Sequence, residues 1–123
     1  IYTTALPAAV AAATRAALAV ASAESWRRAR VLALAGRFRS LAAGAGLPLA
    51  SSTTPIQPVL LGAADAAVEA SRRLLERGYY VAAIRPPTVP ADGARLRVAL
   101  SAVHRDADLD GLVAALADCV PRP

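Results

Sequence analysis

Residues 79–84 read Tyr-Tyr-Val-Ala-Ala-Ile, residues 85–90 read Arg-Pro-Pro-Thr-Val-Pro, and residues 93–99 read Gly-Ala-Arg-Leu-Arg-Val-Ala. The apolar run before the prolines predicts a strand over residues 80–84. Pro86 and Pro87 fix φ near about −65° and exclude a helix, so the chain leaves this strand stiff and extended. A third proline and a glycine turn the chain back into a second strand, residues 95–100, in which Arg97 alternates with apolar neighbours.

This strand-loop-strand frame carries the candidate binding residues. Arg85 ends the first strand, Thr88 lies in the loop, and Arg97 lies on the second strand. Two guanidiniums and a hydroxyl on a rigid frame suit recognition of a carboxylate or a phosphate. The alternative is a proline-rich connection with solvated arginines, which is the usual fate of arginine. Arg95 shares a face with Arg97 because side chains alternate along a strand, yet only one of the two needs to reach a ligand.

The flanking sequence completes an α/β fold. Working outward, hydrophobic spacing and glycine or proline punctuation predict these further elements: helices over residues 8–23, 26–43, 65–77 and 108–117, and a short strand over residues 59–61. In the β-α-β-β-α part, a right-handed crossover makes the first two strands parallel. The third strand then fits between them, antiparallel to both, and helices cover one face of this three-stranded sheet. The helix over residues 8–23 is apolar on most faces and needs more cover than the chain supplies.

Composition excludes several classes of function. The chain has 123 residues, a net charge of +5, and 14 basic residues that are all arginine. Such a charge is compatible with a standalone basic module that binds RNA, but Tyr79 and Tyr80 are adjacent and point to opposite faces of their strand, where bases cannot stack on both. A regulatory or dimerisation module is a third alternative. One cysteine and one histidine leave no disulfide or zinc cluster, so we expect no metal site and a reducing, cytoplasmic setting. No segment predicts a membrane span.

Several motifs in register resemble a known family. Residues 85–90, residues 93–97 and the Ser-Ala-Val-His of residues 101–104 are similar to the C-terminal region of the α-oxoamine synthases, which are pyridoxal-phosphate-dependent enzymes of fold type I. Residues 1–7, Ile-Tyr-Thr-Thr-Ala-Leu-Pro, resemble the family segment that follows the cofactor lysine. Residues 54–58 resemble the start of its small domain. Since the chain begins at Ile rather than Met, we expect a piece of a longer polypeptide.

The resemblance implies a domain organisation and an activity. Residues 1–50 would be a helical segment that links a large and a small domain, and residues 51–123 would be the C-terminal α/β small domain. The branch that fits best condenses L-alanine with a pimeloyl thioester, carried by coenzyme A or a carrier protein, and releases carbon dioxide to give 8-amino-7-oxononanoate in biotin biosynthesis. Sister enzymes use glycine or serine instead. They often place an aromatic residue where this chain has Pro86, which favours the biotin branch.

The resemblance also assigns roles to individual residues. Arg97 would hold the amino acid's carboxylate, Arg85 would assist with that carboxylate or with the acyl portion, and Thr88 would donate a hydrogen bond to bound substrate. The alternative for Arg97 is an ion pair with a helix acid such as Asp106. For Arg95 a structural role is favoured over substrate binding.

Cofactor contacts are expected at the other end of the chain. In a homodimer, Thr3 and Thr4 would reach the partner's pyridoxal phosphate, although either hydroxyl could instead cap the helix that begins after Pro7. The cofactor is held covalently by a lysine, and this chain has none. The lysine and the other catalytic residues therefore lie outside the chain, which should be inactive alone. His104 is expected to be structural rather than an acid or base.

Overall fold

The predicted order of elements is confirmed in the computed structural model, which describes residues 4–121. The elements are α1 (Ala8–Ala23), α2 (Trp26–Gly44), β1 (Ile56–Gly62), α3 (Ala64–Glu76), β2 (Ala82–Ile84), β3 (Ala94–Ala99) and α4 (Asp106–Cys119). The largest difference from the sequence prediction is β1, which is longer than residues 59–61. Pro58 lies inside it, and a strand at the edge of a sheet tolerates proline because one row of backbone groups needs no partner strand.

The sheet has the predicted topology. Its strand order is β1-β3-β2, and β3 runs antiparallel to both neighbours. The register places Leu96 opposite Val59 and Ala83, and Arg97 opposite Pro58 and Ala82. Successive residues along each strand point to opposite faces of the sheet, so this register fixes which side chains meet on each face.

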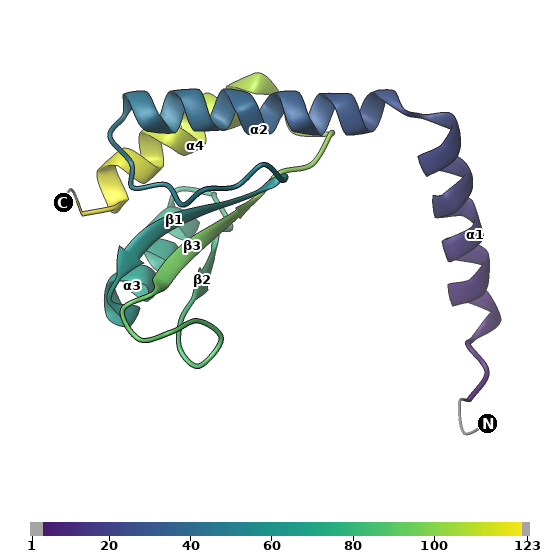
Figure 1. The fold of residues 1–123 in the computed structure, drawn as a ribbon, viewed down its shortest axis with the longest axis horizontal. Coiled ribbons are helices and arrows are strands. Elements are labelled where there is room, and N and C mark those ends of the chain that lie inside the picture. Colours follow the sequence, from purple (N-terminus) through teal and green to yellow (C-terminus); the bar gives the residue numbers. More distant parts are fainter. Residues whose placement is uncertain (1–3, 122–123) are drawn as a thin grey trace.

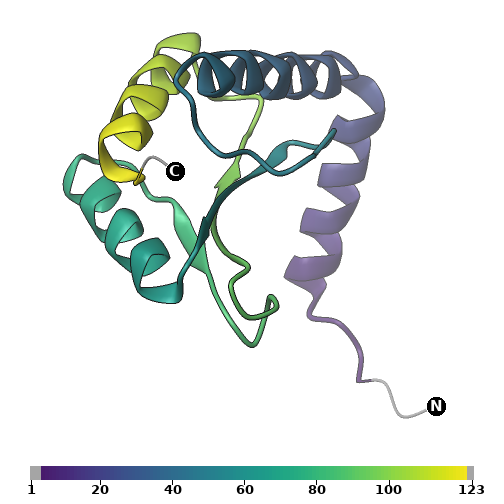
Figure 2. The same ribbon diagram turned by 60° about the vertical axis from the view of Figure 1, so that its left-hand side comes forward.

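Helices cover one face of this sheet. Figure 2 shows α3 and α4 on one side of the strands, with α2 along the top. The alternate residues Ala94, Leu96 and Val98 of β3 are buried under these helices, together with Phe38 of α2 and Leu74 of α3. We call this side the covered face, and the side that carries Arg95, Arg97 and Ala99 the open face.

The three helices of the covered face are joined at their exposed edges by ion pairs. Arg30 and Arg37 of α2 bind Asp106 and Asp110 of α4, with N–O distances of 2.7 and 2.6 Å. Such exposed pairs contribute little to stability, so burial of the apolar side chains remains the main stabilising term. After α3, Gly78 takes φ of +86° and its N–H donates to the carbonyl of Leu75, which is the predicted C-terminal glycine.

By contrast, α1 has almost no cover. None of its 16 residues is buried, although they are mostly alanine, valine and leucine. Figure 1 shows the helix extending away from the sheet and the other helices. The expectation that this helix needs more cover than the chain supplies is confirmed.

Candidate functional site

The loop between β2 and β3, residues 85–93, forms one end of the candidate site, and we call it the proline loop. It consists of two consecutive turns. In the first, the Thr88 N–H donates to the Arg85 carbonyl at 3.1 Å, and in the second the Gly93 N–H donates to the Pro90 carbonyl at 3.0 Å. The Pro86–Pro87 peptide bond is cis. The loop is therefore a folded unit rather than a loose connection.

A hollow of about 290 Å³ lies against the first turn. Its lining residues are Ala83, Ile84, Arg85, Pro86, Pro87 and Thr88. Arg85 and Thr88 are exposed, and within residues 4–121 no hydrogen bond or ion pair occupies the Arg85 guanidinium. The structure therefore brings Arg85 and Thr88 together beside a space that a small polar group can enter.

Arg97 lies on the open face of β3, beyond the end of this hollow. Its side chain is exposed, and none of the described residues forms a hydrogen bond or ion pair with its guanidinium. The alternative of an ion pair with Asp106 is wrong, because that carboxylate binds Arg30 at 2.7 Å. An unengaged guanidinium on a rigid strand is suited to bind an anion bidentately.

Arg95 points to the same face as Arg97 but is engaged. It is half-buried, and its Nε–H donates to the Gly93 carbonyl at 2.8 Å. Residues two apart on a strand are separated by about 7 Å, so Arg97 lies roughly that far beyond Arg95, away from the proline loop. Of the two arginines on this strand, only Arg97 is unengaged.

Apolar side chains surround these arginines on the open face. Ile56 and Leu60 of β1 are 47% and 38% exposed, and Tyr80, just before β2, is 86% exposed. Leu60 and Ile84 flank Arg95 in the strand register. The open face thus combines unengaged cationic groups with apolar surface, which suits a ligand that has both an acid group and a hydrocarbon part.

Of the two predicted cofactor contacts, only Thr4 is described, and it is not brought to this face. Thr3 lies outside the described residues, and Thr4 is exposed just ahead of α1. The cap position of α1 is Pro7, and no side chain bonds to it, so capping by Thr4 is not observed. Figure 1 shows the start of α1 apart from the proline loop.

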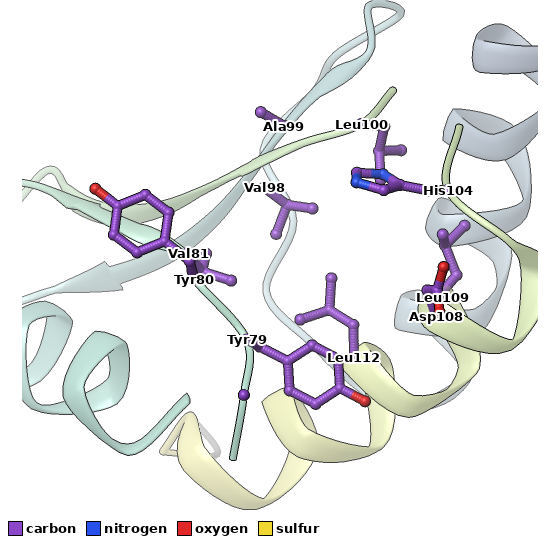
Figure 3. Close-up of a pocket in the computed structure, with 11 residues that line it drawn as sticks. Tyr79, Tyr80, Val81, Val98, Ala99, Leu100, His104, Asp108, Leu109 and Leu112 are labelled. Atoms are coloured by element: carbon purple, nitrogen blue, oxygen red, sulfur yellow. The ribbon is translucent and has the colours of Figure 1, made fainter. Parts of the chain in front are cut away.

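A second hollow, of about 370 Å³, was not anticipated from the sequence. It opens between the start of α4, the end of β3 and the segment before β2, and this last segment is about twenty residues from the other two along the chain (Figure 3). His104 lines it, and its Nδ1 accepts a hydrogen bond from the Ser101 N–H at 3.2 Å, in agreement with a structural role. Figure 3 also shows Tyr79 directed toward α4 and Tyr80 directed away from it.

The charged groups near this second hollow bind each other at the start of α4 and are not directed at a ligand. At the start of α4, the Arg105 guanidinium donates to the Asp108 carboxylate at 2.7 Å, and the Arg105 N–H donates to it at 2.8 Å. These bonds lower the pKa of Asp108 to about 2.

In the described part of the chain, no group of three or more His, Cys, Asp or Glu residues could hold a metal ion. No helix among the described residues is long and apolar enough to cross a membrane.

These features define the class of protein. A three-stranded antiparallel sheet with helices on one face and a preceding pair of helices is the C-terminal part of a fold type I enzyme. The chain belongs to the aminotransferase class I and II family, whose model matches residues 1–116. The resemblance to a pyridoxal-phosphate-dependent family, which the sequence motifs indicated, is therefore confirmed.

Individual proteins and solved structures are also similar to this chain. The chain is 58% identical over 116 residues to the 8-amino-7-oxononanoate synthase of Alkalilimnicola ehrlichii, covering 94% of this chain and 30% of that protein. Among solved structures, it is similar to a serine palmitoyltransferase from S. paucimobilis with a bound PLP–myriocin aldimine, with a TM-score of 0.88, 25% identity, and coverage of 97% of this chain and 30% of the other. It is also similar to the 8-amino-7-oxononanoate synthase from Francisella tularensis, with a TM-score of 0.80, 27% identity, and coverage of 96% and 34%. The chain spans about 30% of the length of the curated relatives it matches.

Proposed function

We propose that the full-length protein containing this chain condenses L-alanine with a pimeloyl thioester, releases carbon dioxide and forms 8-amino-7-oxononanoate. The observation that supports it most strongly is the unengaged Arg97 guanidinium on the same sheet as the Arg85–Thr88 hollow, on a face that no helix of residues 4–121 covers. Relatives that are 51% to 58% identical to this chain carry the name of this synthase. The same membership in an enzyme family argues against the standalone RNA-binding module.

Arg97 is proposed to bind the carboxylate of the amino acid through two parallel N–H···O bonds. Fixing that carboxylate orients the bond that breaks on decarboxylation, which is an effect of positioning. Arg85 is proposed to assist with the same carboxylate or with the acid end of the acyl chain. The Thr88 hydroxyl is proposed to donate a hydrogen bond to bound substrate.

Pyridoxal phosphate is the proposed cofactor of the full-length protein. When bound, it supplies an electron sink for the charge that bond cleavage leaves on the amino acid's α-carbon. The residues of this chain fit only part of its site, because the chain has no lysine to hold the cofactor covalently. Thr3 and Thr4 are proposed to contact the phosphate in a partner subunit, and the lysine is assigned to the part of the protein outside this chain.

The same proposal gives a role to the uncovered helix. Residues 1–50 would link the large domain to the small domain of residues 51–123, and the rest of a homodimeric enzyme would cover α1. The 16 uncovered residues of that helix support this assignment. A cytoplasmic location is proposed with it.

A second candidate function follows from the structural comparison. Serine palmitoyltransferases match with TM-scores of up to 0.90, above the 0.80 of the oxononanoate synthase structure. A sister reaction with serine or glycine as the amino acid therefore competes with the one proposed. Turnover of the full-length protein with L-alanine, glycine and L-serine in parallel separates these candidates, because only the biotin-branch enzyme prefers L-alanine with a pimeloyl thioester.

The test of Arg97 uses the full-length protein loaded with pyridoxal phosphate. Arg97→Ala should lower kcat/KM for L-alanine by about a hundredfold, since charge-assisted hydrogen bonds to the carboxylate are lost. Cofactor binding, followed by absorbance, should persist. Arg72→Ala is the matched control, because it removes an exposed arginine from α3 on the covered side and should leave kcat/KM unchanged. Unchanged steady-state kinetics in Arg97→Ala would refute the assignment.

A further inference from the structure

We infer that Arg95 is a positioning residue, which holds the second turn of the proline loop in place and thereby sets where Thr88 and Arg85 lie. It does this through the Gly93 carbonyl and does not bind substrate itself. The inference deepens the proposed function and rests on it, since Thr88 and Arg85 are the substrate contacts of that proposal. The inference assigns different roles to Arg95 and Arg97, which the sequence alone places on the same face of one strand.

The contact of Arg95 with the loop is specific. Its Nε–H donates to the Gly93 carbonyl at 2.8 Å, and no other hydrogen bond is recorded for this guanidinium in the described chain. The register places Leu60 on one side of Arg95 and Ile84 on the other. Apolar neighbours of this kind cover the methylene stem of an arginine, which restricts its rotamers and leaves its head group directed at the loop.

Gly93 leaves no space between the loop and this guanidinium. A Cβ at this position would lie 3.0 Å from the Pro90 carbonyl oxygen and 3.2 Å from Arg95 Nη2. Glycine lets the arginine approach the turn this closely, because a Cβ would push the Pro90 carbonyl or the guanidinium away by a few tenths of an ångström. On its other side, the turn approaches β1, because a Cβ on Gly62 would lie 3.7 Å from the Asp92 carbonyl oxygen.

The second turn is therefore bound to β3 by a hydrogen bond, and it passes close to Gly62 at the end of β1. The first turn directly precedes it in the chain, with Thr88 two residues before Pro90, and the prolines leave few backbone torsions between the two turns free. Releasing Gly93 from Arg95 should loosen both turns together. The two substrate contacts of the loop would then be lost through displacement, without any loss of charge at the substrate.

Two substitutions of nearly equal size distinguish positioning from direct binding. Arg95→Gln places an amide N–H at the position of the arginine Nε and removes the charge, whereas Arg95→Met places a methyl group there. If the bond to Gly93 is what matters, Gln should stay within about threefold of the wild-type kcat/KM and Met should lose about tenfold, the effect of one hydrogen bond. The loss should lie mainly in kcat for L-alanine, with cofactor occupancy unchanged.

Hydrogen exchange in the full-length protein gives a readout that does not depend on the reaction. The amides of Thr88 and Gly93 close the two turns, so both should exchange about tenfold faster in Arg95→Met and at the wild-type rate in Arg95→Gln. Arg95→Leu also removes the donor to the Gly93 carbonyl and should speed exchange at Thr88 and Gly93 as Arg95→Met does. This third variant tests the contact if Arg95→Met does not fold.

The outcomes that overturn the inference are distinct. Equal loss of activity in Gln and Met with unchanged exchange means that Arg95 acts by its charge on the substrate. Unchanged exchange and unchanged activity in both mean that the contact has no positioning role. If the wild-type protein fails to use L-alanine, the proposed function fails, while the exchange difference between Gln and Met still tests the positioning role.

Discussion

The two faces of β3 come from alternate residues of one six-residue strand, yet they are under different physical constraints. On the covered face, Ala94, Leu96 and Val98 are at most 3% exposed, and the last two belong to a core that contains side chains of α2, α3 and α4. On the open face, Arg95 and Arg97 lie among partly exposed apolar side chains. Cations are tolerated on the open face because water can solvate them there, whereas on the covered face an unpaired charge would be costly.

The difference teaches how stability and chemistry are divided in this domain. Substitutions on the covered face change packing, because close-packed side chains leave cavities when they are shortened. Substitutions at Arg97 should change binding and leave packing intact, since that guanidinium has no partner within residues 4–121. A substitution at Arg95 should affect both local structure and binding, because Arg95 faces the open side but donates a hydrogen bond to the proline loop.

Leu96→Ala should give the largest loss of stability. Leu96 is fully buried between Val59 and Ala83, so its truncation should lower the local free energy of unfolding by about 3 kcal/mol. Native-state hydrogen exchange at the β1 and β3 amides of the full-length protein measures this quantity. The neighbouring Arg97→Ala should change it by less than about 0.5 kcal/mol. Equal destabilisation by the two substitutions would contradict the division between the faces.

A smaller effect is expected at a glycine on the covered side. Gly111 of α4 lies against the Tyr79 hydroxyl, and a Cβ there would overlap with it. Gly111→Ala should therefore destabilise the domain by about 2 kcal/mol, despite the better helix propensity of alanine. Gly36 of α2 is the matched control, because nothing lies within 4 Å of its missing Cβ, and Gly36→Ala should be neutral or stabilising by up to about 1 kcal/mol. Hydrogen-exchange rates at the α4 amides measure the change in stability for both Gly111→Ala and Gly36→Ala.

The smallest effect concerns an exposed charge pair at the start of α4. Because hydrogen bonds from Arg105 lower the pKa of Asp108 from 3.8 to about 2, the pair stabilises the folded state fully above pH 3.8. That contribution should be lost as the pH falls through about 2. An acid titration monitored by circular dichroism should show this loss in the wild type and a shallower pH dependence in Asp108→Asn. An unchanged titration curve would mean that the pair does not stabilise α4.

Much of the fold could be predicted because its signals are local. The proline pair fixed the strand-loop-strand unit, Gly78 marked the end of α3, and the right-handed crossover gave the strand order. The boundaries were less accurate: β1 extends further toward the N-terminus than predicted, since pairing with β3 continues through Pro58 to Ile56. Pairing across a sheet depends on the partner strand, which a strand's own residues do not encode.

The residues of the candidate site were predicted from the sequence, and they remain a prediction, but their arrangement could not be predicted. Arg85, Thr88 and Arg97 were identified from motifs, but only the structure shows that the first two line one hollow and that Arg97 lies beyond it. The expected alternative for Arg97 failed because Arg30, on a different helix, occupies Asp106. Which cation reaches a given carboxylate depends on how the helices pack.

By itself, the sequence determined the family, the order of helices and strands, and the stiffness of the proline loop, because motifs, hydrophobic period and proline geometry all act over a few residues. Only the tertiary structure decided that Arg95 is bound to the Gly93 carbonyl while Arg97 stays unengaged. The two arginines are the same residue on the same face of one strand. What distinguishes them is the position of the loop that turns back beside Arg95, and that position exists only once three strands are paired.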